Sequence, residues 1–536
     1  MKTAFSFLNL LLIVTQVFSQ NNQDAKRDHQ WVMGVPNNQT NNPPGAILWD
    51  FNNISPPAIL PFSYDDHYLG QSNACISDTL GELILFSGGF DVKNKNGSTI
   101  LNGDSLSFGS TYIAYPLNLD IYHGVAILPL PGTPNTYYVF HQRRELIYQI
   151  GGFIYSNELL YSTVTLNEIT GEYEVITKNN RIILDTLAFG FEITRHANGR
   201  DWWLVQPCLD ESRFYKVLFT PAGIYSVNMQ MITPQFGNLY NDYFPHTEQN
   251  PSTIAPDGSF FVKASFEGIS PVFHTPGYVI IRVYDFDRCT GILSNQRAVI
   301  TDTLPPCHPW IKLCISPNSR YLYMSYCLNN QNPERESMIY QYDLSVPDFG
   351  QTKQLVAQYD GFYDSTCAEY PLFHTMQNGP DNKIYVDGKS SGWIHAIEFP
   401  DNQGLSCSFI QRKFYLGFGM TSFLPHLPNY RLGPISGSVC DSLTAGIADL
   451  KPNMPVFSVY PNPAADHVQV SWDKPSGGQC GYSLFNTMGA VIRSGSFPLS
   501  GLKYTISLSE VPEGMYFLSI QSQDGLGNIN KIIVLY

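Results

Sequence analysis

Histidine and arginine side chains in two parts of this sequence have types and spacing suited to chemistry. Imidazoles transfer protons near neutral pH, and guanidinium groups bind carboxylates and phosphates. On a protein surface such residues would form a ligand-binding face. The alternative is that they hydrogen-bond within the fold, as most buried polar side chains do. The candidates are His123, His141, Arg143, Arg144, His308, Trp310 and His374.

Two short segments suggest metal ligands, but neither has a strong ligand pattern. CHPWIKLC places His308 between Cys307 and Cys314, and this spacing matches no common zinc site, so a disulfide or buried thiols are favoured. DVKNKNGS, from Asp91, resembles a calcium loop, but lysines stand where oxygen ligands are needed. The sequence therefore predicts no metal site and no cofactor.

The common catalytic signatures are absent from the sequence. It has no HExxH peptidase motif, no GxSxG nucleophile elbow, no P-loop and no GxGxxG fingerprint. Catalytic residues are therefore not predicted, and a role other than catalysis is favoured.

Composition limits the class of protein. The 536 residues include 31 basic and 45 acidic ones, a net charge of −14, and only 14% of residues are charged. Nucleic acid is an improbable partner, because phosphates require clustered Lys and Arg. The 33 Tyr, 33 Phe, 42 Gly and 37 Pro favour many short strands joined by turns over a helical protein.

The first residues are typical of a secretory signal peptide. Lys2 precedes an uncharged apolar run from Ala4 to Phe18, and Val17-Phe18-Ser19 fits a cleavage site before Gln20. The run is short for a membrane span, and no other segment is apolar enough to cross a bilayer. An exported chain permits disulfides among its ten cysteines, although their pairing cannot be read from the sequence.

A degenerate repeat occupies most of the chain. Turns rich in Pro, Asp, Asn and Gly, each followed by an aromatic or β-branched strand, recur about every 59 residues. Seven copies predict a β-propeller of about seven blades across residues 20–433, with six or eight as alternatives. A β-sandwich or solenoid is the other interpretation. The turn markers are Asp28, Gly81, Asn135, Gly199, Gly258, Ser319 and Asn382.

A second module follows the propeller. Residues 434–455 are rich in Gly, Ser and Pro and predict a linker, and residues 456–536 predict a small antiparallel β-sandwich. Its expected strands are Val456–Tyr460, His467–Trp472, Gly481–Asn486, Ala490–Gly495, Thr505–Leu508, Gly514–Gln521 and Asn530–Tyr536.

This module resembles the type A C-terminal sorting domain of Bacteroidota type IX secretion. The likeness lies in SVYPNPAADHVQVSW, SLFNTMGAVI, ISLSEVPEGMYFLSIQS and INKIIVLY, in that order. It implies export through the periplasm and the outer-membrane translocon to the surface or medium, usually with removal of the module. The motif residues are Tyr460, Pro461, Asn462, Pro463, Gly489, Gly514, Tyr516 and Lys531.

The propeller resembles a group of exported Bacteroidota proteins of unassigned activity, through segments such as YDFDRCTGILSN, CISPNSRYLYMS and GPDNKIYV. With no catalytic motif, we expect a binding or interaction module for a glycan, peptide or protein. The alternative is an extracellular hydrolase or lyase with its site at the mouth of the propeller channel, and a purely structural role is a third. Clustered His, Asp and Glu at that mouth would favour the enzyme.

Overall fold

The structure is a computed structural model, and it divides the chain into two compact units, residues 1–443 and 444–536. The residues it describes are 24–35, 45–52, 56–64, 67–114, 116–147, 153–235, 251–267, 278–301, 310–327, 336–366, 368–389, 391–417, 424–441, 458–472, 478–486, 491–522 and 527–535. The expected signal peptide, residues 1–19, lies outside them.

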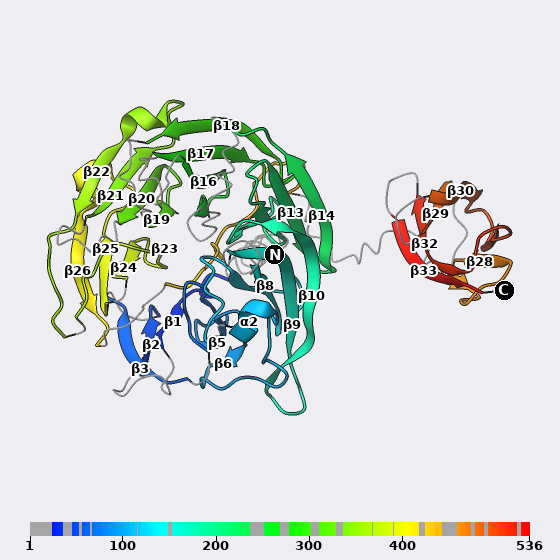
Figure 1. Ribbon diagram of the computed structural model, residues 1–536, viewed down its shortest axis with the longest axis horizontal. Helices are drawn as coiled ribbons and strands as arrows, with labels where there is room; N and C mark the ends of the chain where they lie inside the picture. Colours follow the sequence, from blue (N-terminus) through cyan, green and yellow to red (C-terminus); the bar gives the residue numbers. More distant parts are fainter. Residues whose placement is uncertain are drawn as a thin grey trace, which may run out of the picture. The chain divides into compact units, whose positions relative to one another are not determined.

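Seven antiparallel sheets in the described part of the first unit form a ring of blades, which confirms the propeller (Figure 1). The first three sheets are β1 (Gln30–Gly34), β2 (Ala46–Asp50) and β3 (Ala58–Phe62); β4 (Ala74–Ser77), β5 (Leu83–Ser87) and β6 (Lys93–Asn94); and β7 (Val125–Pro129), β8 (Thr136–Ile147), β9 (Phe153–Leu166) and β10 (Tyr173–Leu187). A short helix, α2 (Ser110–Ala114), precedes β7.

The other four sheets have four strands each. They are β11 (Glu192–Arg195), β12 (Trp202–Pro207), β13 (Arg213–Thr220) and β14 (Gly223–Met231); β15 (Ser252–Ile254), β16 (Phe260–Glu267), β17 (Tyr278–Phe286) and β18 (Leu293–Ile300); β19 (Trp310–Ile315), β20 (Tyr321–Cys327), β21 (Ser337–Asp343) and β22 (Gln354–Gln358); and β23 (Met376–Asn378), β24 (Ile384–Asp387), β25 (Trp393–Ile397) and β26 (Phe409–Tyr415). Two 3₁₀ turns, η4 (Phe349–Thr352) and η5 (Gly404–Cys407), join strands in the last two.

The turn markers share one backbone conformation and one position in six of the blades. Six of the seven residues have positive φ, from 56° at Asn135 to 97° at Gly81, and each joins the first two strands of a blade. Gly, Asn and Asp tolerate this conformation better than most residues. Asp28 is the exception, because it precedes β1 instead of following it. The first blade was therefore marked one strand too early.

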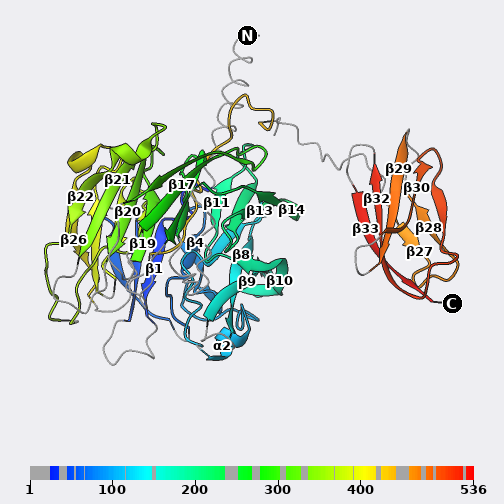
Figure 2. The same cartoon turned by 45° about the horizontal axis from the view of Figure 1, so that its top comes forward.

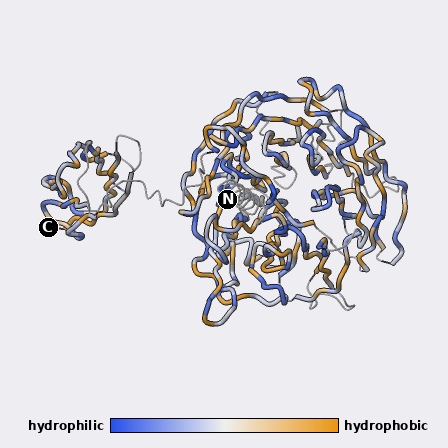
Figure 3. Tube along the Cα trace, turned by 180° about the vertical axis from the view of Figure 1, so that it is seen from behind, coloured by the Kyte–Doolittle hydropathy of each residue, from blue (hydrophilic) through white to orange (hydrophobic). Residues whose placement is uncertain are grey.

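Burial within a blade follows strand position. Every residue of β12 and β20 is buried, whereas the outermost strand β14 alternates towards solvent. A strand that is covered on both faces has a nearly continuous apolar sequence, whereas a half-exposed strand alternates apolar and polar residues. In the tilted view, β20, β21 and β22 stand side by side (Figure 2), and hydrophobic and hydrophilic positions are interspersed along the blades (Figure 3).

The ring closes through aromatic packing between the last blade and the first. The Tyr385 ring of β24 lies 4.7 Å from the Trp49 ring of β2, and Phe414 of β26 lies 5.3 Å from Trp49, measured between centroids. Each described sheet of the propeller consists of strands consecutive in the chain. The first and last blades therefore share no described sheet and meet through side-chain packing.

After β26 the chain returns across the inner strands in what we call the return segment, residues 424–441. Its backbone and side chains bond to three blades: His426 N donates to Asn73 O at 2.7 Å, and Tyr430 Oη donates to Ile127 O at 2.8 Å. Asn429 Nδ2 donates to Pro256 O at 2.8 Å. These bonds hold residues 424–430, most of which are buried, against the propeller.

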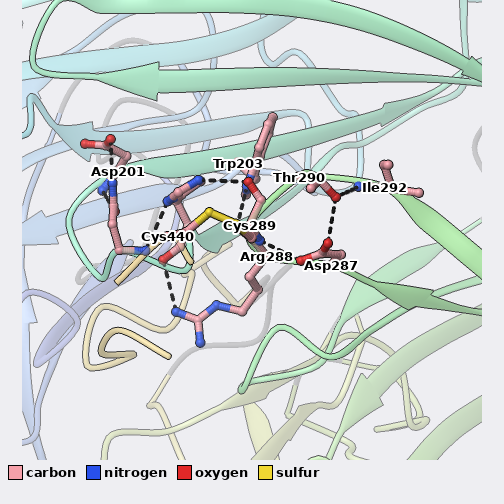
Figure 4. The surroundings of a disulfide bond; sticks show 10 residues. Asp201, Trp203, Asp287, Arg288, Cys289, Thr290, Ile292 and Cys440 are labelled. Carbon is pink, nitrogen blue, oxygen red and sulfur yellow. Dashed lines mark hydrogen bonds between the residues drawn. A yellow bond between two sulfur atoms is a disulfide. The ribbon is translucent and has the colours of Figure 1, made fainter. Parts of the chain in front are cut away.

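The end of the return segment is fixed by a disulfide between Cys289 and Cys440 (Figure 4). Beside it, Arg288 Nη2 donates to Gly433 O at 2.6 Å, and Ile435 N donates to Ala197 O at 2.9 Å. A Cβ on Gly199 would lie 2.6 Å from Pro434, so the close approach requires glycine. Residues 434–441 of the expected linker therefore contact the propeller, and 442–455 lie outside the described residues.

The second unit contains two antiparallel sheets of three and four strands, as expected for a small β-sandwich. The strands are β27 (Ser458–Tyr460), β28 (His467–Ser471), β29 (Gln479–Asn486), β30 (Val491–Pro498), β31 (Lys503–Ser507), β32 (Gly514–Ser522) and β33 (Gly527–Val534). Their side chains enclose one apolar core, in which Val468, Leu484, Leu518 and Ile532 are fully buried. All seven expected strands are present.

Candidate functional site

A pocket of about 130 Å³ lies within the propeller, where the inner strands β11, β15, β19 and β23 meet the return segment. Polar and apolar residues of these four strands line it, together with Asp28 from before β1 and His123 from before β7. The charged or ionisable residues among them are Asp28, His123, Glu192, Cys314, His426 and Arg431. Three of these, His123, Glu192 and His426, form one cluster, which we call the channel cluster.

His123 enters the pocket from a tight turn before β7. The turn is closed by Gly124 N donating to Ile121 O at 3.0 Å, and His123 itself has a φ of 55°. Its Nδ1 lies 2.8 Å from Oε1 of Glu192, the first residue of β11. A carboxylate only accepts, so Nδ1 carries the proton and Nε2 carries the lone pair.

Glu192 has a second hydrogen-bond donor on the same oxygen. Ser252, the first residue of β15, donates from Oγ to Glu192 Oε1 at 3.0 Å. The Glu192 side chain is only 4% exposed. Two hydrogen bonds therefore hold a buried carboxylate in one orientation, with its other oxygen, Oε2, directed towards His426.

His426 reaches the cluster from the return segment. Its Nδ1 lies 3.2 Å from the backbone oxygen of Val125, which can only accept, so Nδ1 is protonated. Its Nε2 lies 3.8 Å from Glu192 Oε2. The rings of His123 and His426 are stacked, with centroids 4.0 Å apart and planes 4° from parallel.

Burial and mutual attraction set the charges of this cluster. Burial opposes ionisation of Glu192, but attraction to His123 and the hydrogen bond from its Nδ1 outweigh this cost and lower the carboxyl pKa. Burial and repulsion from His426 lower the pKa of His123 despite the nearby carboxylate. At neutral pH the first two members are thus an ionised carboxylate and a neutral imidazole.

The structure brings together only some of the residues singled out from the sequence. His123 lies in the pocket. Trp310 and His374 form a separate pair, with ring centroids 5.8 Å apart, beside Asp387 and the Lys389 ammonium, which lies 3.6 Å from the centroid of the Trp310 ring. His308 lies outside the described residues.

The remaining three lie on β8 and bond within the fold. His141 is fully buried between the hydroxyls of Ser107, at 2.8 Å from Nδ1, and Ser162, at 3.1 Å from Nε2. Arg143 pairs with Glu158 at 2.7 Å. Arg144 donates to the backbone oxygens of Leu119 and Asp120. A role for these residues in ligand binding stays a prediction.

Sequence reasoning did not select Glu192 or His426. Glu192 is the first residue of the inner strand in FGFEITR, and superposing the repeats at inner-strand positions would have drawn attention to it. His426 stands between prolines in LPHLPN, a segment interpreted as the end of the last blade. Asp91, from the weak calcium pattern, is instead bound by Lys93 and by His67.

The two units together define an exported all-β protein: a propeller joined to a C-terminal β-sandwich. Residues 458–535 match the family model of the secretion system C-terminal sorting domain. The chain is therefore a type IX secretion substrate, carried to the cell surface or the extracellular space, and its sorting domain interacts with that secretion machinery. Of the helices described in the structure, none has the length and apolar character needed to span a membrane.

Several solved structures are similar to the chain at low identity. A puromycin hydrolase structure matches with a TM-score of 0.32 and 10% identity over 74% of this chain and 55% of that one. A streptogramin B lyase matches with a TM-score of 0.27 and 9% identity, over 73% and 85% of the two chains. A GH43 β-1,3-galactosidase matches with a TM-score of 0.27 and 11% identity, over 58% and 96%. No curated protein matches the sequence.

Proposed function

We propose that the exported propeller binds a small polar molecule in the pocket that contains the channel cluster, which we call the channel pocket. The observation that carries this proposal is the channel cluster, in which one buried carboxylate and two imidazoles converge from three distant parts of the chain. Burying an ionised carboxylate costs free energy unless hydrogen bonds compensate for it. A pocket with a few convergent polar groups is the usual form of a small-molecule site.

The lining of the pocket suggests the character of its ligand. Thr194, Thr253, Gln377 and Asn378 offer hydroxyl and amide groups, while apolar side chains such as Leu313 cover the remaining walls. Such a mixture suits a molecule with several hydrogen-bonding groups on an apolar frame. A sugar or a short peptide has this character, in line with the glycan or peptide expected from the sequence.

The proposal is tested by screening the full chain against oligosaccharides and short peptides, with thermal shift followed by calorimetry. A ligand of the pocket binds at least about 10-fold more weakly to Glu192→Gln, because a charge-assisted contact is lost. Glu82→Gln removes an exposed carboxylate outside the pocket and serves as the matched control. A ligand with equal affinity for all three proteins would overturn the proposal.

A second candidate is a hydrolase or lyase acting in the same pocket, and the hydrogen bond between His123 and Glu192 favours it. A carboxylate that fixes a neutral imidazole through Nδ1 leaves Nε2 free to accept a proton, which is the arrangement of a general base. For an enzyme, incubation with the bound ligand gives a product detectable by mass spectrometry. His123→Gln then lowers kcat about 100- to 10,000-fold while binding persists.

A further inference from the structure

We propose that His123, Glu192 and His426 together bind one divalent transition-metal cation, with Zn²⁺ as the expected ion. The inference departs from the sequence-based expectation of no metal site. It rests on the proposed function in one respect, since both need the channel pocket to be accessible to a ligand from solution.

The distances within the channel cluster suit a cation. Each residue offers one ligand atom, and the three atoms lie within 4.8 Å of one another. Two ligand atoms at tetrahedral positions around Zn²⁺ are about 3.3 Å apart, since each lies about 2.0–2.1 Å from the metal. Glu192 Oε2 and His426 Nε2, at 3.8 Å, are close to that separation. The rings of His123 and His426 are stacked with planes 4° from parallel, so one ring must turn before both lone pairs reach the same ion. Binding through His123 Nδ1 also releases the proton that this nitrogen donates to Glu192.

A positive charge between Glu192 and His426 would stabilise this part of the channel cluster. Because Nδ1 of His426 donates to the Val125 carbonyl, the Nε2 of a neutral imidazole carries a lone pair. Nε2 lies 3.8 Å from Glu192 Oε2, so two electron-rich atoms would be neighbours. A metal cation between the two atoms removes the repulsion.

The outer contacts of the cluster have the pattern found around metal ligands. Histidine ligands commonly donate their second ring N–H to a backbone carbonyl or carboxylate, which fixes the tautomer, and ligating carboxylates are themselves hydrogen-bonded. His426 donates to Val125 O in this way, and Ser252 donates to Glu192. Both contacts orient the ligand atoms before an ion arrives.

The donor set indicates which cation would bind. Two imidazoles and one carboxylate suit Zn²⁺ and other first-row transition ions, whereas Ca²⁺ and Mg²⁺ prefer oxygen ligands alone. Three protein ligands leave a coordination position open, as in catalytic rather than structural zinc sites.

The ammonium group of a nearby lysine adds positive charge beside the site. Lys312 is buried on β19, and its ammonium lies 4.1 Å from the centroid of the Tyr122 ring, which is itself stacked on His123. Lys312 also contributes to the lowered pKa of His123. Its charge opposes metal binding, so the expected affinity is below that of a cluster without a neighbouring ammonium.

Metal binding is measured on the untagged full chain after chelator treatment and dialysis. Zn²⁺ is titrated at pH 7 by calorimetry, and bound metal is counted by elemental analysis. We expect one ion per chain for the wild type. We expect at least about 100-fold weaker binding for Glu192→Gln and for His426→Gln, since each loses a direct ligand. His467→Gln removes an exposed histidine of the sorting module and should bind as the wild type does.

Folding of each variant is checked by circular dichroism. If His426→Gln does not fold, Glu192→Gln and the visible absorption of Co²⁺ bound to the wild type still report on the site. Absence of Zn²⁺ uptake by folded wild type, or unchanged affinity in both variants, overturns the inference.

The two proposals fail separately. If a polar ligand binds chelator-treated protein as tightly as Zn²⁺-loaded protein, and no Zn²⁺ is taken up, only the metal inference falls. If Zn²⁺ binds with the expected variant pattern but the screen gives no pocket ligand, the metal site stands and the proposed ligand class is wrong.

Discussion

The side-chain oxygen of Asn462 accepts a hydrogen bond from the backbone N–H of Ile533 at 2.9 Å. The YPNP turn at the start of the sorting module is thereby joined to β33 at its end. Ala464 continues the connection, since its N–H donates to Ile533 O and its carbonyl accepts from Leu535 N, both at 2.8 Å. Pro461 and Pro463, each preceded by a cis peptide bond, offer no N–H to compete with these contacts.

Asn462→Ala should weaken this closure and reduce secretion. Loss of one partly exposed hydrogen bond lowers the unfolding free energy of the module by about 0.5–1.5 kcal/mol. In the native host we expect less protein at the surface and in the medium and more in the periplasm, measured by fractionation and immunoblotting. Asn462→Asp keeps the acceptor oxygen and is the matched control. Normal export of the Ala variant would show that the turn acts without this bond.

Tyr385→Ala should loosen the ring of blades where the last blade meets the first. Tyr385 is fully buried and packs on Trp31, Trp49 and Phe51. Removing a buried aromatic ring lowers the unfolding free energy by about 3–5 kcal/mol. Denaturant unfolding followed by tryptophan fluorescence measures the change.

The matched variant Tyr385→Phe keeps the ring and loses only the hydrogen bond from Oη to Asp381, at 2.8 Å. It should cost about 1 kcal/mol. Equal losses in the two variants would mean that the hydrogen bond, and not ring packing, closes the propeller.

Much of the fold was predictable because it is encoded locally. A positive-φ residue such as Gly81, Gly258 or Asn382 leaves a visible trace in the sequence, since few residue types suit it. Each blade carries its own turn, so the repeat could be counted without knowing how blades meet. The marker of the first blade was wrong because Asp28 precedes β1, whereas the markers of the other six blades lie between their first two strands.

The channel cluster was not predictable because its members are distant in the chain. His123 and Glu192 are 69 residues apart, and His426 bonds to Val125 across 301 residues. Each residue alone reads as an ordinary polar side chain beside a strand. Only the closure of the ring and the path of the return segment bring the three together.

The Cys289–Cys440 disulfide should stabilise the propeller by holding the return segment in place. It closes a loop with a sequence separation of 151, and a cross-link of this length restricts the unfolded chain strongly. Replacing both cysteines by serine should lower the unfolding free energy by about 3–5 kcal/mol. Urea denaturation measures this, and reducing agent should have the same effect on the wild type but none on the variant. An unchanged midpoint in the double variant would contradict a stabilising role.

Stability of the propeller should fall on mild acidification because buried histidines stay neutral in the native state. Burial lowers the pKa of His141 to about 3, and that of His395 likewise, whereas histidine in an unfolded chain titrates near 6.5. At a pH between these two pKa values, each such histidine binds a proton in the unfolded chain but not in the native state. The unfolding free energy therefore decreases as pH falls below 6.5, by about 1.4 kcal/mol per pH unit for each such histidine.

His141→Gln isolates one of these contributions. Glutamine does not titrate, and it can both donate and accept a hydrogen bond, as the neutral ring does between Ser107 and Ser162. The loss of stability between pH 7.5 and pH 5.0 in urea denaturation should therefore be smaller than in the wild type by about 2 kcal/mol. His467→Gln, at an exposed position of the other unit, should leave the loss unchanged. An equal loss in the His141 variant and the wild type would mean that native His141 binds a proton as readily as the unfolded chain does, which its complete burial between two hydroxyls argues against.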